Sequence, residues 1–191
     1  ILRVAASLMR TRRDELAAWE IVECGKPWRE ADADVAEAID FLEFYAAEWR
    51  RIAPPRRLGQ EPGELNQRLY SPRGVTAVIA PWNFPLAIPT GMVSAALVTG
   101  NPVIFKPSER SPMMGHWLTE ILREAGVPEG VLCCLPGGPD IGRALVRHPD
   151  IATIAFTGSK DVGLAILNDA GTLMPGQQMV KRVLAEMGGK N

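Results

Sequence analysis

Histidine and cysteine are scarce in this sequence, and their spacing excludes two classes of site. The 191 residues include only two histidines, so a histidine metal cluster is not expected. The three cysteines, Cys24, Cys133 and Cys134, form neither a disulfide framework nor a metal-binding spacing. Cys133 and Cys134 lie within the apolar run 131–135, and we expect both to be buried in a strand.

Acidic and basic residues are nearly equal in number, 22 and 21. The formal net charge is −1 at pH 7, and no basic stripe is interleaved with aromatic residues. Nucleic-acid binding is therefore not expected. Hydrophobic residues make up 47% of the chain and charged residues 23%, which is ordinary for a soluble globular protein.

One long stretch, Gly74 to Phe105, lacks charged residues altogether. It is long enough to suggest a membrane span, but prolines and asparagines interrupt it. A strand, a turn, a buried helix and a second strand explain it better. No secretory signal segment is visible. We therefore expect no membrane span and a cytoplasmic protein.

The N-terminal part, residues 1–73, is predicted to be a helical segment followed by a connector. Residues 1–23 are predicted to form one helix, and residues 31–52 a second helix with apolar side chains at three- and four-residue spacing. Proline, arginine and glycine are frequent in 54–63, which is predicted to be the connector. Residues 65–70 are predicted to form a short edge strand.

From residue 74 the pattern changes to alternating strands and helices. The predicted strands are 75–80, 103–106, 131–135, 152–156 and 182–185, with helices at about 86–99, 112–125, 139–148 and 160–170. Such alternation is typical of right-handed crossovers in an open parallel sheet. The sequence therefore predicts a Rossmann-like α/β fold with N-terminal helices, in which 74–191 is the dinucleotide-binding domain.

Short motifs follow four of the predicted strands, where ligands bind in parallel α/β sheets because helix N-termini and free N–H groups point into the crevice. These motifs are Pro81-Trp82-Asn83-Phe84-Pro85, Lys106-Pro107-Ser108-Glu109, Phe156-Thr157-Gly158-Ser159 and Glu186-Met187-Gly188-Gly189. The usual Gly-x-Gly-x-x-Gly fingerprint after the first strand is absent.

Several of these residues are candidates for contacts with a dinucleotide. Glu109 and Lys106 lie where ribose hydroxyls are usually bound, although a solvated charged loop would give the same pattern. Ser159 would hold a phosphate oxygen or simply cap a helix. Outside the four motifs, Gly138 and Gly142 follow the predicted strand 131–135 and allow a close backbone approach there, or merely form a tight turn.

Asn83 and Glu186 are the candidates for catalysis. The Asn83 amide lies in a rigid, partly apolar turn, which suits the stabilisation of a developing oxyanion. A turn-stabilising asparagine would look the same. Glu186 is placed to act as a general base on water. A solvent-exposed acid at the end of a strand is equally compatible with its position.

Taken together and in this order, the four motifs resemble those of the aldehyde dehydrogenase superfamily. The resemblance covers nearly the whole chain and is strongest from Ser71 to Asn191. It implies that Asn83 helps to hold the oxyanion and that Glu186 is the general base. It also implies that Lys106 and Glu109 contact the adenosine ribose.

The resemblance further implies NAD or NADP as cofactor, bound without the usual glycine fingerprint. Gly158 and Ser159 are then expected beside the pyrophosphate. The other implied cofactor contacts are Ile79, Pro81, Trp82, Ser108, Gly138, Gly142, Phe156, Met187 and Gly188. Glu109 would repel a 2′-phosphate and so favours NAD, whereas Lys106 tolerates either cofactor.

Two stretches narrow the resemblance to the glutamate-γ-semialdehyde (1-pyrroline-5-carboxylate) dehydrogenases: Phe84 to Met92, and Pro175 to Lys190. They imply oxidation of L-glutamate γ-semialdehyde to glutamate in proline catabolism. Such enzymes occur alone or fused behind a proline dehydrogenase, so the parent protein is expected to be a homo-oligomer or such a fusion. The alternatives are a dehydrogenase of another aldehyde, such as succinate semialdehyde, and a non-catalytic dinucleotide-binding module.

In that family the nucleophile is a cysteine thiolate, which lies some tens of residues beyond the motif that contains Glu186. None of the cysteines of this chain is expected to replace it. The chain as given is therefore expected to be a fragment of the aldehyde dehydrogenase fold, without dehydrogenase activity of its own.

Overall fold

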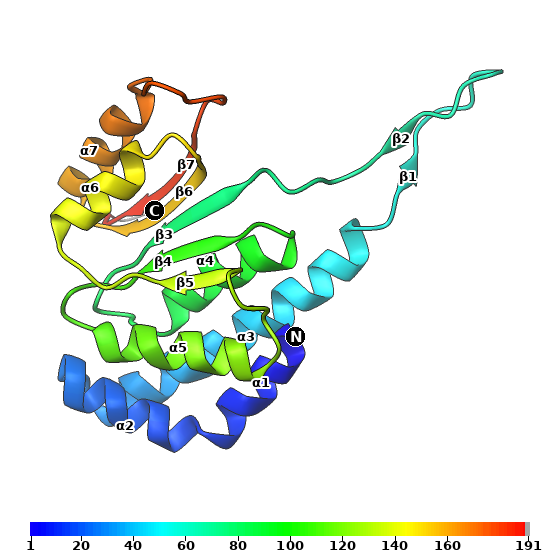
Figure 1. Cartoon of the computed structure of the whole chain (residues 1–191). Helices are drawn as coiled ribbons and strands as arrows, with labels where there is room; N and C mark the ends of the chain where they lie inside the picture. Colours follow the sequence, from blue (N-terminus) through cyan, green and yellow to red (C-terminus); the bar gives the residue numbers. More distant parts are fainter. Residues whose placement is uncertain (190–191) are drawn as a thin grey trace.

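A central parallel sheet with helices on both faces forms the body of the molecule, and a thin two-stranded ribbon projects from it (Figure 1). The computed structural model describes residues 1–189. Lys190, which ends one of the stretches that carry the resemblance, and Asn191 lie outside the described residues.

The sheet has five parallel strands in the order β5-β4-β3-β6-β7. The strands are β3 (Val75–Ile79), β4 (Val103–Lys106), β5 (Leu132–Cys134), β6 (Ile151–Gly158) and β7 (Arg182–Met187). The chain enters at the middle, moves outward through β4 and β5, and then returns to β6 on the other side of β3. The predicted Rossmann-like sheet is thus confirmed, with its change of direction between β3 and β6. Ligands bind at such switch points.

Helices that connect the strands cover both faces of the sheet (Figure 1). On one face lie α4 (Ala87–Val98) and α5 (Pro112–Glu124), and on the other lie α6 (Pro139–Arg147) and α7 (Lys160–Gly171). Because strand side chains alternate between faces, Val78 belongs to the core under α4 and α5 and Ala77 to the core under α6 and α7.

The N-terminal helices form a further layer outside α4 and α5 (Figure 1). They are α1 (Leu2–Thr11), α2 (Arg13–Cys24) and α3 (Trp28–Ile52). The prediction of one helix over 1–23 is wrong, because Arg12 leaves the helical conformation at φ −109° and ψ 16°. The break lets α1 and α2 each pack against both α3 and α5, which one straight helix would not do.

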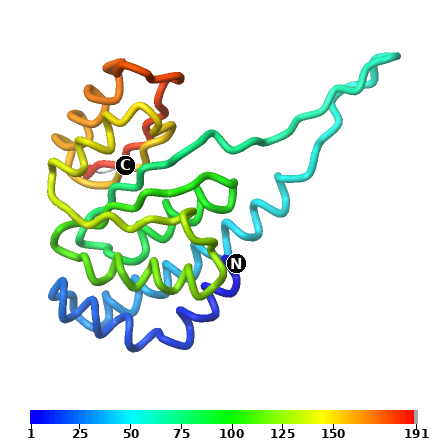
Figure 2. Tube along the Cα trace, viewed as in Figure 1, coloured from blue at the N-terminus to red at the C-terminus, as the bar shows by residue number. Residues whose placement is uncertain are grey.

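The connector also differs from the prediction. Arg56–Arg57 (β1) and Gln67–Arg68 (β2) pair with each other as an antiparallel ribbon that extends away from the body (Figures 1 and 2). The edge strand predicted at 65–70 therefore does not join the main sheet. Glycines with positive φ at Gly59 and Gly63 allow the intervening segment to turn back, so local pairing becomes possible.

A buried ionic cluster joins α2 to α3. The Nζ atom of Lys26 lies 2.9 Å from Oδ2 of Asp34 and 3.1 Å from Oε2 of Glu20, and both acidic side chains are fully buried. Burial, followed by the charge of Asp34, raises the pKa of Glu20 to about 9, against the opposing effect of Lys26. Glu20 is therefore protonated at neutral pH.

The variant Glu20→Gln should flatten the pH dependence of stability. A free carboxyl loses its proton near its ordinary value of 4.5, whereas the folded protein retains it up to about 9. The contribution of Glu20 to the free energy of unfolding is therefore fully present below pH 4.5, the pKa of the free carboxyl. It is lost as the pH rises toward about 9, the pKa in the folded protein. Glutamine keeps the neutral shape at every pH.

Urea denaturation measures the free energy of unfolding of the wild type and the variant at about pH 5 and about pH 8. Between these two pH values, the wild type should lose more stability than Glu20→Gln. Glu15→Gln, which changes an exposed acid on the same helix, is the control. An equal loss in wild type and Glu20→Gln would contradict the expectation.

Candidate functional site

A cleft with a volume of about 970 Å³ opens at the carboxyl ends of β3, β4, β6 and β7, beside the first residues of α6 and α7. Every residue that the sequence suggested for catalysis or cofactor binding lies on its wall: Ile79, Pro81, Trp82, Asn83, Lys106, Ser108, Glu109, Gly138, Gly142, Phe156, Gly158, Ser159, Glu186, Met187 and Gly188. Segments more than 100 residues apart in the sequence thus meet at one edge of the sheet.

The register of the strands brings these residues together. Lys106, Ile79 and Phe156 lie in one row across β4, β3 and β6. Glu186 is paired with Thr157, one position beyond this row. The expectation that Glu186 follows its strand is wrong, because β6 and β7 stay paired past this position. Glu186 is therefore held on a regular strand rather than on a loop.

At one end of the cleft, a carboxylate and an ammonium group lie beside the start of α6. A β-carbon at Gly138 would lie 3.1 Å from Oε2 of Glu109, so a larger residue would push this carboxylate aside. The Nζ atom of the buried Lys106 donates to the carbonyl oxygen of Pro107 at 3.1 Å. Burial lowers the pKa of Lys106, while Glu109 acts in the opposite direction. This polar end is suited to binding vicinal hydroxyl groups.

The start of α7 provides hydrogen-bond donors to the middle of the cleft. The hydroxyl oxygen of Ser159 accepts a hydrogen bond from the N–H of Val162 at 3.4 Å, so Ser159 caps the helix. Its hydroxyl hydrogen remains able to donate to a further acceptor. A β-carbon at Gly158 would lie 2.7 Å from the Phe156 ring, so only glycine fits without movement of the ring. A helix start of this kind attracts anions.

Asn83 and Glu186 face the same cleft from different elements. Asn83 is exposed in the turn between β3 and α4, and the guanidinium group of Arg110 lies 5.6 Å from the centroid of the neighbouring Trp82 ring. Glu186 is exposed on β7. Burial raises the pKa of Tyr45 on α3, and the negative charge of Glu186 adds to this effect.

A second hollow, with a volume of about 580 Å³, adjoins the cleft and shares Glu186 with it. Phe41 of α3 and Met92 of α4 contribute to its wall, and a β-carbon at Gly91 would touch the Phe41 ring at 3.3 Å. Sequence reasoning missed this hollow, because periodicity places Phe41 on a helix without showing which helix it packs against. The available signal was Gly91, an unusual residue in the interior of a helix.

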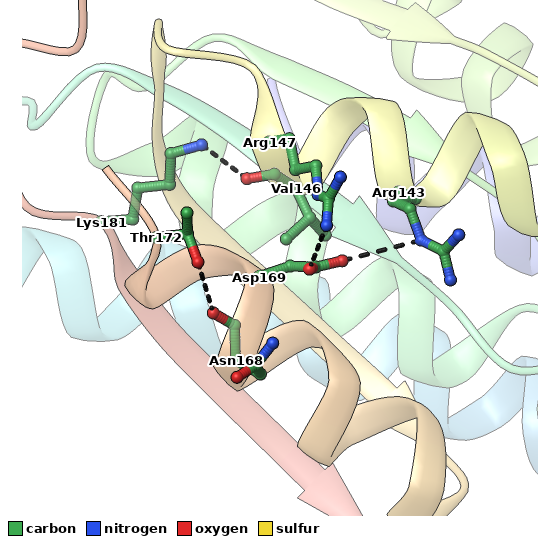
Figure 3. A network of polar contacts seen from close by, with 7 residues as sticks. All are labelled: Arg143, Val146, Arg147, Asn168, Asp169, Thr172 and Lys181. Atoms are coloured by element: carbon green, nitrogen blue, oxygen red, sulfur yellow. Dashed lines mark hydrogen bonds and ion pairs between the residues drawn. The ribbon is translucent and has the colours of Figure 1, made fainter. Parts of the chain in front are cut away.

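Ion pairs join α6 and α7 beside the cleft, and Figure 3 shows these contacts. Asp169 accepts a hydrogen bond from Arg147 at 2.7 Å and lies 3.7 Å from Arg143, and both Asp169 and Arg143 line the cleft. The buried Lys181 donates to the carbonyl oxygen of Val146 at 2.5 Å and so attaches the end of α6 to the start of β7. Only a weak signal for these contacts is present in the sequence, namely two arginines four residues apart on one helix.

The cysteines lie away from the cleft, and both cysteines of β5 are less buried than expected. Cys133 is exposed and Cys134 is half-buried, because β5 is an edge strand with a neighbour on one side only. Burial raises the pKa of Cys134 and also raises that of Cys24 to about 11. Thiols with raised pKa values are poor nucleophiles at neutral pH.

Within residues 1–189, no group of three or more His, Cys, Asp or Glu side chains is arranged to hold a metal ion. No helix in this part of the chain is both long enough and apolar enough to cross a membrane.

Comparison with known proteins gives a consistent result. The whole chain, residues 1–191, matches the family model described as the aldehyde dehydrogenase family. The chain is 50% identical over 192 residues to the 1-pyrroline-5-carboxylate dehydrogenase of Geobacillus thermodenitrificans. This match covers 100% of the chain but 37% of that protein, so the chain spans little more than a third of the length of the curated relatives it matches.

Solved structures with a similar backbone include a protein of the same name. The structure of 1-pyrroline-5-carboxylate dehydrogenase from Thermus with bound NAD has a TM-score of 0.96 and 50% identity, and the match covers 99% of this chain and 37% of that one. Proline utilization A (PutA) from Bdellovibrio bacteriovorus has a TM-score of 0.96 and 51% identity, covering 98% of this chain and 20% of that one.

Proposed function

Because the chain belongs to the aldehyde dehydrogenase family, we propose that it forms the cofactor-binding part of an NAD-dependent enzyme that oxidises L-glutamate γ-semialdehyde to glutamate. The main support is the single cleft on which all the suggested catalytic and cofactor residues lie. The names of the relatives, 1-pyrroline-5-carboxylate dehydrogenase and PutA, support the choice of substrate.

The chemistry of the cleft fits a dinucleotide. Lys106 and Glu109 would bind the hydroxyls of the adenosine ribose, and the helix starts at Gly138 and Ser159 would direct N–H groups toward the pyrophosphate. The other proposed contacts are Ile79, Pro81, Trp82, Ser108, Gly142, Phe156, Gly158, Met187 and Gly188. When bound, NAD supplies the acceptor for the hydride that leaves the aldehyde carbon.

Two side chains of the cleft would act on the reacting groups. The amide N–H of Asn83 would donate to the oxyanion that forms when a thiolate adds to the aldehyde carbon. Glu186 would take a proton from the water that hydrolyses the resulting thioester. Since none of the three cysteines borders the cleft, the thiolate is not among them, and the 191-residue chain alone should bind the cofactor without turnover.

A chimera tests this function directly. This chain replaces the matching 37% of the Thermus enzyme, whose backbone it follows with a TM-score of 0.96. We expect NAD-dependent turnover of glutamate semialdehyde and little turnover of succinate semialdehyde. A preference for succinate semialdehyde would overturn the substrate assignment. A folded chimera that binds NAD without turnover would favour a non-catalytic binding module, and turnover by the 191-residue chain itself would show that another nucleophile is used.

The variant Glu109→Gln should weaken the preference for NAD over NADP. A carboxylate beside the ribose repels a 2′-phosphate, and glutamine keeps the shape without the charge. We expect the ratio of the two dissociation constants, measured by calorimetry, to fall by roughly tenfold or more. Glu129→Gln, an exposed acid outside the cleft, is the control. An unchanged ratio in Glu109→Gln would contradict a role for this charge.

A further inference from the structure

The buried cluster of Glu20, Lys26 and Asp34 contacts the segment that carries Asn83. The carboxylate oxygen Oδ1 of Asp34 accepts a hydrogen bond from the N–H of Ala87 at 3.0 Å. Ala87 is the first residue of α4, and the preceding N-cap residue makes no side-chain cap. Asp34 therefore caps this helix from a different layer of the fold.

The second contact lies closer to Asn83. The Nζ atom of Lys26 lies 4.5 Å from the centroid of the Phe84 ring. Phe84 directly follows Asn83, and Ala87 lies four residues after Asn83. The cluster therefore holds the segment that contains Asn83 at two points. Within the described part of the chain, no hydrogen bond fixes the side-chain amide of Asn83. Its direction therefore depends on how the backbone of the turn is held.

We propose that Lys26 and Asp34 are positioning residues that direct the Asn83 amide into the cleft. This inference rests on the proposed function, because it concerns the group assigned to the oxyanion. Lys26 links the two contacts, since the same ammonium group binds the Asp34 carboxylate and lies over the Phe84 ring.

A role in helix packing alone would not require this arrangement. Burying an ion pair is costly, and apolar side chains of similar volume usually hold helices together at least as well. Directional contacts instead select one orientation of the groups they bind. The Asp34 side chain is 0% exposed, and both its oxygens accept a hydrogen bond: Oδ1 from the N–H of Ala87 and Oδ2 from Nζ of Lys26.

The position of the Asn83 amide can be followed by NMR in the 191-residue chain. We expect Lys26→Met to shift or broaden the side-chain amide signal of Asn83, and Lys26→Arg to restore it in part. Arg12→Gln is the control, because it removes an ion pair with Glu124, at 2.7 Å, that lies away from the turn. If Lys26→Met does not fold, the same signal is recorded in the double variant Lys26→Met/Asp34→Asn, which removes the cation together with its partner Asp34 and so avoids leaving that carboxylate unpaired.

Kinetics of the chimera separate positioning from packing. A displaced amide should lower kcat by about 100-fold, while the dissociation constant for NAD stays within about twofold. The inference is overturned if a folded variant without the Lys26 cation keeps both the Asn83 signal and kcat. If the wild-type chain does not bind NAD, the proposed function fails instead, and the NMR signal still reports whether Lys26 and Asp34 hold the turn.

Discussion

Replacing Asn83 with alanine should lower kcat of the chimera by about 100- to 1,000-fold, the cost of removing one donor to an oxyanion. NAD binding by the 191-residue chain should change little, because the donor acts only when negative charge develops on the aldehyde oxygen. Steady-state kinetics of the chimera and calorimetry of the chain measure the two quantities separately.

Asn168→Ala is the matched control for this substitution, since it removes an exposed asparagine that does not line the cleft. A small loss of kcat in Asn83→Ala, comparable with that in the control, would exclude an oxyanion role. An equal loss of NAD affinity and kcat would instead make Asn83 a cofactor contact.

The variant Glu186→Gln should separate the two halves of the reaction. Loss of a general base typically lowers the rate of the step it serves by about 100- to 10,000-fold. If Glu186 activates only the hydrolytic water, the first turnover should still release a burst of NADH, after which steady-state turnover nearly stops. Stopped-flow absorbance of the chimera records both phases.

Glu129→Gln, an exposed acid outside the cleft, is expected to keep both phases at wild-type rates. Loss of the burst together with the steady-state rate in Glu186→Gln would contradict this division. Glu186 would then be needed before the hydride leaves, for example to take the proton of the attacking thiol.

The parallel sheet was predictable because its signals are local. Each strand is a short apolar run. Glycine follows the end of a helix, as at Gly100 after α4, and proline marks the start of one, as at Pro112 in α5. Residues at or just after the carboxyl ends of such strands must meet at one edge of a parallel sheet. The common location of Asn83, Lys106 and Glu186 therefore follows from the alternation of elements.

Other features depend on contacts between distant segments, which no local pattern encodes. The break at Arg12 allows two helices to pack on α3 and α5, although nothing in the periodicity interrupts the helix there. Cys133 is exposed because β5 is at the edge of the sheet, and strand order is not visible in an apolar run. Lys26 and Asp34 resemble ordinary polar residues at a helix start until the neighbouring layer is known.

An NMR titration of the 191-residue chain with NAD is the most direct test that the cleft binds a dinucleotide. The largest shifts are expected at the backbone amides of Lys106, Gly138, Gly158 and Ser159, which line the cleft on different elements. Amides of α1, which packs on α3 and α5 and contributes no residue to the cleft, should not move. The absence of any shift at millimolar NAD, or shifts confined to residues outside the cleft, would contradict cofactor binding at this site.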